Sequence, residues 1–291
     1  MTLLWFWLHR KEHTLSMEQL YSVARIKRQS FHEWLEGKMQ KQEMYNQLLP
    51  LVRQIRKEHP GMSSRVMYAM LNPVGIGRDK FIDWCNKEGF KLELKRSPHR
   101  TTNSLGVTRF ENKIKDLQIK RANQVWVSDI TYYRIGEQFC YITLIMDQYS
   151  KKIVGYHASK ALLTTSTTIP ALQLAMKGYH KTGKLILHSD GGGQYYSKDF
   201  IKLTRAAKIV NSMTEDLAEN NHAERLNGTI KNQYLSYYMP TTFNQLKIEL
   251  KRAVNNYNET RPHDSLGKQY PASIHWLSIR NNSTYKVSNL N

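Results

Sequence analysis

The chain has 291 residues, more than one average domain, so we expect two or three compact units. Hydrophobic residues make up 40% and charged residues 23% of the chain, as in folded globular proteins and unlike disordered or membrane chains. The chain has 43 Lys and Arg residues against 24 Asp and Glu residues, which gives a net charge of +19. Basic residues are in excess in both halves of the chain. This surplus indicates a polyanionic partner, nucleic acid first. The alternative is a basic protein that is merely soluble.

The cysteines and the N-terminal apolar run exclude further classes. Cys85 and Cys140 lie far apart and outside any C-x-x-C pair, so neither a disulfide framework nor a cysteine zinc site is supported. The run Leu3–Leu8 is six residues long and is followed, not preceded, by basic residues, so it is neither a signal peptide nor a membrane span. We therefore interpret residues 1–15 as an N-terminal arm. We expect a cytoplasmic protein without a membrane partner.

Residues 16–92 are predicted to hold two pairs of helices. In residues 16–60, a short helix, a break and a helix over Arg28–Glu36 are followed by a longer helix that ends near His59. Residues 61–92 contain two further helices around the turn 72–77. Both pairs are typical of helix-turn-helix units, in which the second helix enters the major groove of DNA by its N-terminal residues. The candidate DNA contacts are therefore Arg28, Arg78 and Lys80. Ordinary helical hairpins in an all-α domain are the alternative.

The next two segments differ in composition and in their predicted secondary structure. Residues 93–122 hold few apolar and many basic residues, which is typical of a linker lying along DNA phosphates. From residue 123 to 240 the pattern predicts three antiparallel strands, a helix, a strand, a helix, a strand and a helix. The three antiparallel strands are Val125–Arg134, Phe139–Asp147 and Ile153–Ser159. This is the order of the α/β ribonuclease-H-like fold, and residues 241–291 would form a C-terminal helical extension.

Two acids sit where the predicted core is otherwise apolar. Asp129 lies in the middle of the first strand, where an acid is costly unless something pairs with it. Asp190 follows the strand Leu185–His188 at the carboxyl end, where α/β sheets expose their sites. The three glycines 191–193 let the backbone pass close to a ligand. For Asp190 alone, a strand-end cap is the competing interpretation.

A third acid, Glu224, lies on the last core helix, which begins near residue 220 or 221. Asn227 and Lys231 share its helix face at i+3 and i+7. The neighbouring stripe should bury against the sheet and consists of Leu226, Ile230 and Tyr234. An isolated Glu in a helix is usually a solvated surface residue. Glu224 is assigned to the site only because the two strand acids are predicted to lie near it. Three converging carboxylates suit two Mg²⁺ ions, which take oxygen ligands and can promote in-line displacement at a phosphodiester.

Five motifs follow one another along the chain: Trp126–Tyr133, Tyr141–Gly155, His188–Asp190 with Gln194 and Tyr195, Ala223–Lys231, and Tyr257–Leu266. In this order they resemble those of bacterial insertion-sequence transposases of the second-reading-frame type, whose catalytic core is similar to that of retroviral integrases. The resemblance covers most of the chain. It implies an integrase-type core preceded by helix-turn-helix units.

The resemblance also implies an Asp, Asp, Glu triad carried by Asp129, Asp190 and Glu224, with Mg²⁺ or Mn²⁺ as cofactor. Cleavage at terminal inverted repeats would free a 3′-hydroxyl for attack on target DNA, by a dimer or larger homo-oligomer and with a first-reading-frame partner or fusion. The residues of these motifs expected to contact DNA are Arg225, Asn227, Lys231 and Arg261. Asp147 corresponds to a strand-end structural residue and stays outside the triad.

The chain departs from the family's usual pattern in two places. Asp190 and Glu224 are separated by 33 residues, slightly fewer than is usual in the family, and glycines stand where the loop commonly begins with a basic residue. Glu219 is the nearby competitor for the third acid.

The alternatives to a transposase are a DNA-binding regulator or decayed element, and a nuclease that cuts without joining. If the helix-turn-helix units recognise the DNA ends, deleting residues 1–95 should abolish specific binding and spare the core fold.

Overall fold

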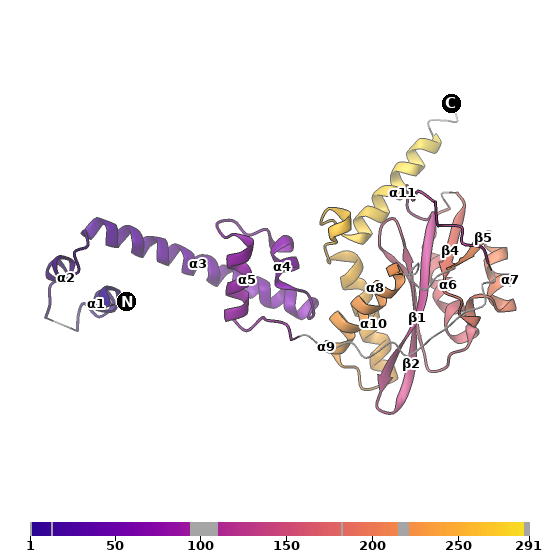
Figure 1. The fold of residues 1–291 in the computed structure, drawn as a ribbon, viewed down its shortest axis with the longest axis horizontal. Helices are drawn as coiled ribbons and strands as arrows, with labels where there is room; N and C mark the ends of the chain where they lie inside the picture. The colour runs from indigo at the N-terminus through magenta and orange to yellow at the C-terminus, as the bar shows by residue number, and fades with distance from the viewer. Residues whose placement is uncertain (1, 13, 94–109, 182, 215–220, 288–291) are drawn as a thin grey trace. The chain divides into compact units, whose positions relative to one another are not determined.

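The structure is a computed structural model that describes residues 2–12, 14–93, 110–181, 183–214 and 221–287 (Figure 1). It divides into two compact units, residues 1–55 and residues 56–291. Among the helices of these residues, none is both long enough and apolar enough to cross a membrane.

The first unit is helical. It contains α1 (Thr2–Leu8), α2 (Met17–Val23) and most of α3 (Arg28–Glu58). Ser16 begins α2 with a capping box, in which its side chain and that of Gln19 satisfy each other's backbone N–H groups. Tyr21, Phe31 and Leu35 form the small apolar centre of this unit. Trp34 is 44% exposed and carries the ammonium of Lys38 over its ring at 4.5 Å.

Helix α3 corrects the prediction of two successive helices in residues 28–59. It runs without interruption from Arg28 to Glu58, through Gly37 and Pro50. The stretch between these two residues is polar and was read as a boundary, but it is rich in Lys, Gln, Glu and Met, which are good helix formers. Helix propensity therefore continues the helix where the apolar pattern fades.

The second unit opens with the predicted helix pair, which the structure confirms as α4 (Ser64–Leu71) and α5 (Arg78–Lys87). Asn72 ends α4 in the left-handed conformation, with φ of 43°. The guanidinium of Arg56 ties the pair together by donating to the carbonyl oxygens of Pro60 and Met62 and to that of Phe90 at 2.9 Å. The use of these helices as a DNA-binding helix-turn-helix unit stays a prediction.

The remainder of the second unit is built on a five-stranded mixed sheet with the order β3-β2-β1-β4-β5 (Figure 1). The strands are β1 (Val125–Ile135), β2 (Gln138–Asp147), β3 (Ile153–Ser159), β4 (Leu185–Ser189) and β5 (Ile209–Met213). The first three pair antiparallel as predicted, while β4 pairs parallel to both β1 and β5. This sheet and the order of its helices confirm the ribonuclease-H-like fold.

Helices cover both faces of this sheet. On one face lie α6 (Thr168–Lys177) and α7 (Lys198–Ala206), packed against Trp126, Leu187 and their neighbours. On the other lie α8 (Asn221–Ile230), the π-helical turn η4 (Lys231–Leu235), α9 (Ser236–Tyr238) and α10 (Phe243–Glu259). Short 3-10 turns occur at Thr164–Ser166, Gly193–Tyr195 and Asp264–Leu266, and α11 (Pro271–Val287) ends the described chain.

The core extends beyond both of its predicted boundaries. On the N-terminal side, Ile114, Leu117 and Ile119 of the expected linker pack on the face that α8 covers, so residues 110–122 belong to the core. On the C-terminal side, α10 buries Leu250 and Tyr257 in the same cluster, although it was expected to lie in an extension. Apolar residues are too sparse in 110–122 to reveal the burial of this segment, whereas those of α10 recur at helical spacing. The basic residues Lys95, Arg96, Arg100 and Arg109 lie outside the described residues.

Candidate active site

The parallel pairing of β1 with β4 brings the two strand acids to one edge of the sheet. The last paired residues are Ser128 and Ser189, and Asp129 and Asp190 are the next residues along their chains. Side chains alternate along a strand, so Asp129 points to the same face as Val127, which is the face that α8 covers. The predicted juxtaposition of two carboxyl groups at the carboxyl end of neighbouring strands therefore follows from the strand register.

Burial and a neighbouring charge both affect the ionisation of Asp129. Burial, first, and the charge of Asp190, second, raise the pKa of Asp129 to about 7. Two hydrogen bonds to its carboxylate act in the opposite direction. The backbone N–H of Ile130 donates to Oδ1 and the Nδ2 of Asn227 donates to Oδ2, each at 2.8 Å. Burial also raises the pKa of Asp190, against a hydrogen bond of 3.2 Å from the backbone N–H of Gly192.

Glu224 lies in the first turn of α8, as predicted, and is exposed. The stripe beside it is buried as expected, with Leu226 and Ile230 each no more than 3% exposed. The charge of Glu224 contributes to the raised pKa of Asp129, so it lies within electrostatic reach of that acid. Within the described residues, however, no three His, Cys, Asp or Glu side chains lie close enough together to hold a metal ion. The structure thus gathers Asp129 and Asp190 and leaves Glu224 at the rim.

The segment that precedes Glu224 lies outside the described residues, which omit 215–220. Glu219, the competitor for the third acid, belongs to that segment. The choice of Glu224 over Glu219 therefore stays a prediction.

Asn227 and Lys231, both expected to contact DNA, are directed toward β1. Asn227 is 6% exposed and donates to Asp129. The ammonium of Lys231 donates to Oγ1 of Thr131 at 3.3 Å and lies 4.5 Å from the centre of the Tyr132 ring. Burial lowers the pKa of Lys231. In this arrangement Asn227 orients a carboxylate, and its contact with DNA stays a prediction, as does that of Lys231.

The other predicted DNA contacts fall into two groups. Four side chains are exposed: Arg28, Arg78, Lys80 and Arg225. The guanidinium of Arg78 forms an ion pair of 2.9 Å with Asp79. Arg261 is only partly exposed, and its charge helps to lower the pKa values of His59 and His263, which places it among core side chains. The role of all five in DNA binding is untested.

Tyr195 is a site residue that sequence reasoning left without a role. It is 2% exposed, and its hydroxyl lies 2.9 Å from Oγ of Ser128, the residue before Asp129. Burial, followed by the charges of Asp190 and Asp129, holds the pKa of Tyr195 above its ordinary value. Its position after the triglycine within a family motif was the available signal, but a single sequence does not show that it lies beneath the acids.

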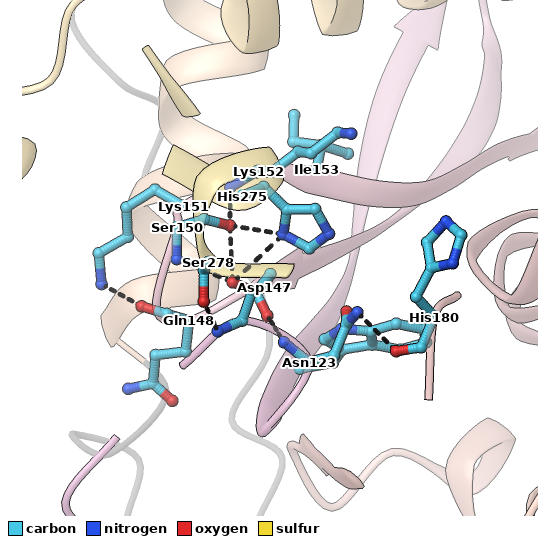
Figure 2. A network of polar contacts seen from close by, with 12 residues as sticks. Asn123, Asp147, Gln148, Ser150, Lys151, Lys152, Ile153, His180, His275 and Ser278 are labelled. Carbon is cyan, nitrogen blue, oxygen red and sulfur yellow. Dashed lines mark hydrogen bonds and ion pairs between the residues drawn. The ribbon is translucent and has the colours of Figure 1, made fainter. Parts of the chain in front are cut away.

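Asp147, the acid set outside the triad, has a structural environment. It is fully buried, and its carboxylate accepts hydrogen bonds from the backbone N–H of Asn123 and from both the N–H and the hydroxyl of Ser150 (Figure 2). The same hydroxyl lies 2.9 Å from Nδ1 of His275 on α11. Since its acceptors are used within the fold, Asp147 ties the β2–β3 turn to the segment just before β1 and, through Ser150, to α11.

Comparison with known proteins identifies this architecture. An integrase core domain family model matches residues 119–216, and a second integrase core domain model matches residues 205–271. The first match includes all five strands with Asp129 and Asp190, and the second includes α8 with Glu224 and α10. The chain thus contains an integrase-type core.

Relatives among curated proteins are encoded by insertion elements. A 31 kDa protein of insertion element IS600 from Shigella sonnei is 28% identical over 87% of this chain and 96% of its own length. The transposase of IS629 from Shigella sonnei is 31% identical over 56% of each chain, and the InsF transposase of IS3A from Escherichia coli is 31% identical over 34% of each. These relatives and the two core-domain matches support an insertion-sequence transposase with an integrase-like core.

Solved structures with a similar fold include retroviral integrases. The catalytic core domain of HTLV-2 integrase, solved in complex with magnesium, is 20% identical, covers 53% of this chain and 97% of its own, and has a TM-score of 0.44. The core domain of BIV integrase is 19% identical, covers 55% of this chain and 99% of its own, and has a TM-score of 0.43.

Proposed function

We propose that this chain catalyses DNA transposition: it cuts at the terminal inverted repeats of an insertion sequence and joins the freed 3′-hydroxyl to target DNA. The observation that carries this proposal is the pair Asp129 and Asp190 at one edge of an integrase-type sheet, beside the helix that carries Glu224. The insertion-element relatives agree with it.

The side chains at this edge fit a divalent cation. Two partly buried carboxylates whose charges repel each other present only oxygen donors, which are the donors that Mg²⁺ and Mn²⁺ prefer. Asp129 and Asp190 would hold the metal, and Glu224 would complete the set from the rim. Bound divalent ions, two in our proposal, stabilise the charge that develops on the attacking and leaving oxygens of a phosphodiester.

The chain's own groups would prepare this site. Asn227 and the N–H of Ile130 fix both oxygens of Asp129, so the carboxylate is oriented before a ligand arrives. Lys231 places a positive charge next to Thr131, where a DNA phosphate approaching the acids would be attracted. The basic residues Arg28, Arg78, Lys80 and Arg225 supply further positive charge on exposed surfaces.

Double-stranded DNA is the expected partner, as terminal repeats and as target. Because two ends must be brought together for transposition, we propose that a homodimer or larger assembly forms on DNA. A first-reading-frame partner or fusion, and location with the nucleoid in a bacterial cytoplasm, belong to the same proposal.

The test is a joining assay with Mn²⁺, a labelled terminal repeat and a target plasmid. Wild-type protein should give joined products, and Asp129→Asn and Asp190→Asn should give none while binding the repeat. Asp116→Asn, which alters an exposed acid outside the site, is the matched control and should join like wild type. Binding without products would favour the DNA-binding regulator or decayed element. Cleavage without joined products would favour a nuclease.

A further inference from the structure

The turn that follows α3 is inserted into the catalytic core. His59 is fully buried, with its Nδ1 2.7 Å from the hydroxyl of Tyr234 and its Nε2 3.0 Å from Oγ1 of Thr260. The hydroxyl of Thr260 donates to the carbonyl oxygen of Asn256, so it has no second proton for the imidazole. Nε2 of His59 must therefore carry the proton and donate to Thr260, while the Tyr234 hydroxyl donates to Nδ1. The neutral imidazole satisfies both partners.

Backbone groups on either side of His59 are held as well. The N–H of Gly61 donates to the carbonyl oxygen of Gln233 at 2.9 Å. The carbonyl oxygen of Glu58 accepts from the hydroxyl of Tyr238 at 2.9 Å and from Nδ2 of Asn256 at 2.6 Å. A Cβ atom on Gly61 would lie 2.4 Å from Cα of Gln233 and 2.7 Å from its carbonyl oxygen, so any other residue forces one of the two backbones to move. Residues 57–62, which we call the clasp, thus fit the core closely.

The segment that the clasp contacts is the continuation of the helix that carries the site. Helix α8 ends at Ile230 and passes directly into the π-helical turn η4, which holds Gln233 and Tyr234. Lys231 is the first residue of that turn. A π-helical turn is uncommon and interrupts the regular backbone pattern, and here the carbonyl of Gln233 accepts its bond from Gly61. A shift of this turn would carry Lys231 and Asn227 away from their partners on β1.

We propose that the clasp is a positioning element of the active site, in which His59 and Gly61 fix the π-helical turn and thereby the approach of Lys231 and Asn227 to β1. The inference rests on the proposed function. It also changes the expectation for the deletion of residues 1–95. That cut removes every bond of the clasp, so it should disturb the core instead of sparing it.

The experiment compares full-length Gly61→Ala, Tyr234→Phe and Gly178→Ala with wild type. Tyr234→Phe removes only the hydroxyl that meets His59, and a Cβ at Gly178 has nothing within 4 Å, which makes Gly178→Ala the matched control. Three quantities are measured: the single-turnover joining rate in Mn²⁺ at saturating DNA, the Kd for the terminal repeat, and amide hydrogen exchange in the peptide 221–238.

If the clasp positions the active site, Gly61→Ala should lower the joining rate by about 100-fold and change the Kd for the terminal repeat by less than about twofold. Exchange in 221–238 should become faster in Gly61→Ala and, to a smaller extent, in Tyr234→Phe, with Gly178→Ala like wild type. If Gly61→Ala does not fold, Tyr234→Phe carries the test.

Wild-type joining rates with unchanged exchange in both clasp variants would overturn the proposal, as would a parallel loss of DNA affinity and joining. If wild-type protein itself yields no joined product, the proposed function fails. The exchange comparison then still decides whether the clasp holds the helix.

Discussion

Lowering the pH should reduce the free energy of unfolding through protonation of His59 in the unfolded chain. Replacing His59 by Gln should remove this part of the pH dependence. The native imidazole is neutral, because burial, helped by the charge of Arg261, lowers the pKa of His59 to about 4 from an ordinary value of 6.5. In the unfolded chain the same side chain is free to take up a proton below pH 6.5. Below that pH the unfolded state therefore binds more protons than the native state, so the free energy of unfolding falls as the pH falls.

The size of the effect follows from the two pKa values. The stability that His59 contributes is complete above about pH 6.5 and declines until about pH 4. At pH 4.5, each unit below 6.5 costs about 1.36 kcal/mol, so wild-type protein should lose about 2 to 3 kcal/mol through this residue. Gln cannot be protonated and keeps an amide to meet Tyr234 or Thr260. His59→Gln should thus be less stable than wild type near pH 7.5 and approach or exceed it near pH 4.5.

Urea unfolding followed by circular dichroism at several pH values measures this difference. The contributions of the carboxylates and of His263 are common to both proteins and cancel in the comparison. His180→Gln, which changes an exposed histidine, is the control and should follow the wild-type curve. Parallel curves for wild type and His59→Gln between pH 7.5 and 4.5 would refute the reasoning.

Three further predictions concern the acids and α11. Asp190→Asn should lower the pKa of Asp129 below about 7, because it removes the charge of Asp190, the second-largest cause of the raised value. An NMR titration of metal-free protein measures this pKa, and an unchanged value would contradict the coupling between the two acids. Asn227→Ala should raise the Mn²⁺ concentration for half-maximal joining by about tenfold, through loss of a charge-assisted hydrogen bond. An unchanged metal requirement would show that the bond does not orient Asp129. His275→Ala should lower the free energy of unfolding by about 1 to 3 kcal/mol, because the buried network around Asp147 loses a member. Equal urea midpoints would contradict that.

The positions of the strand acids could be predicted because they depend on local patterns. Asp129 interrupts an apolar, β-branched run, and Asp190 follows a short apolar strand, so each was placed before any pairing was known. The parallel register of β1 and β4 then brings them together. The burial of Asn227 could not be predicted from its helix face alone. Asn227 was expected to contact DNA, whereas in the structure its amide donates to Asp129.

The clasp could not be predicted because its contacts are remote in sequence. His59 and Tyr234 are 175 residues apart, and nothing in the local pattern around His59 distinguishes it from an ordinary helix end. The continuity of α3 was missed for a different reason. Apolar periodicity fades between Leu35 and Leu48, where helix propensity and i,i+4 side-chain hydrogen bonds such as that from Gln42 to Asn46 support the helix.

The central claim is that Asp129, Asp190 and Glu224 form one site for DNA strand transfer. Its most direct test is to measure joined product in Mn²⁺ from wild type, Glu224→Gln and Glu219→Gln side by side, after each variant has been shown to bind the terminal repeat. The account predicts joining by wild type and by Glu219→Gln, and none by Glu224→Gln. Joining by Glu224→Gln at the wild-type rate would contradict it.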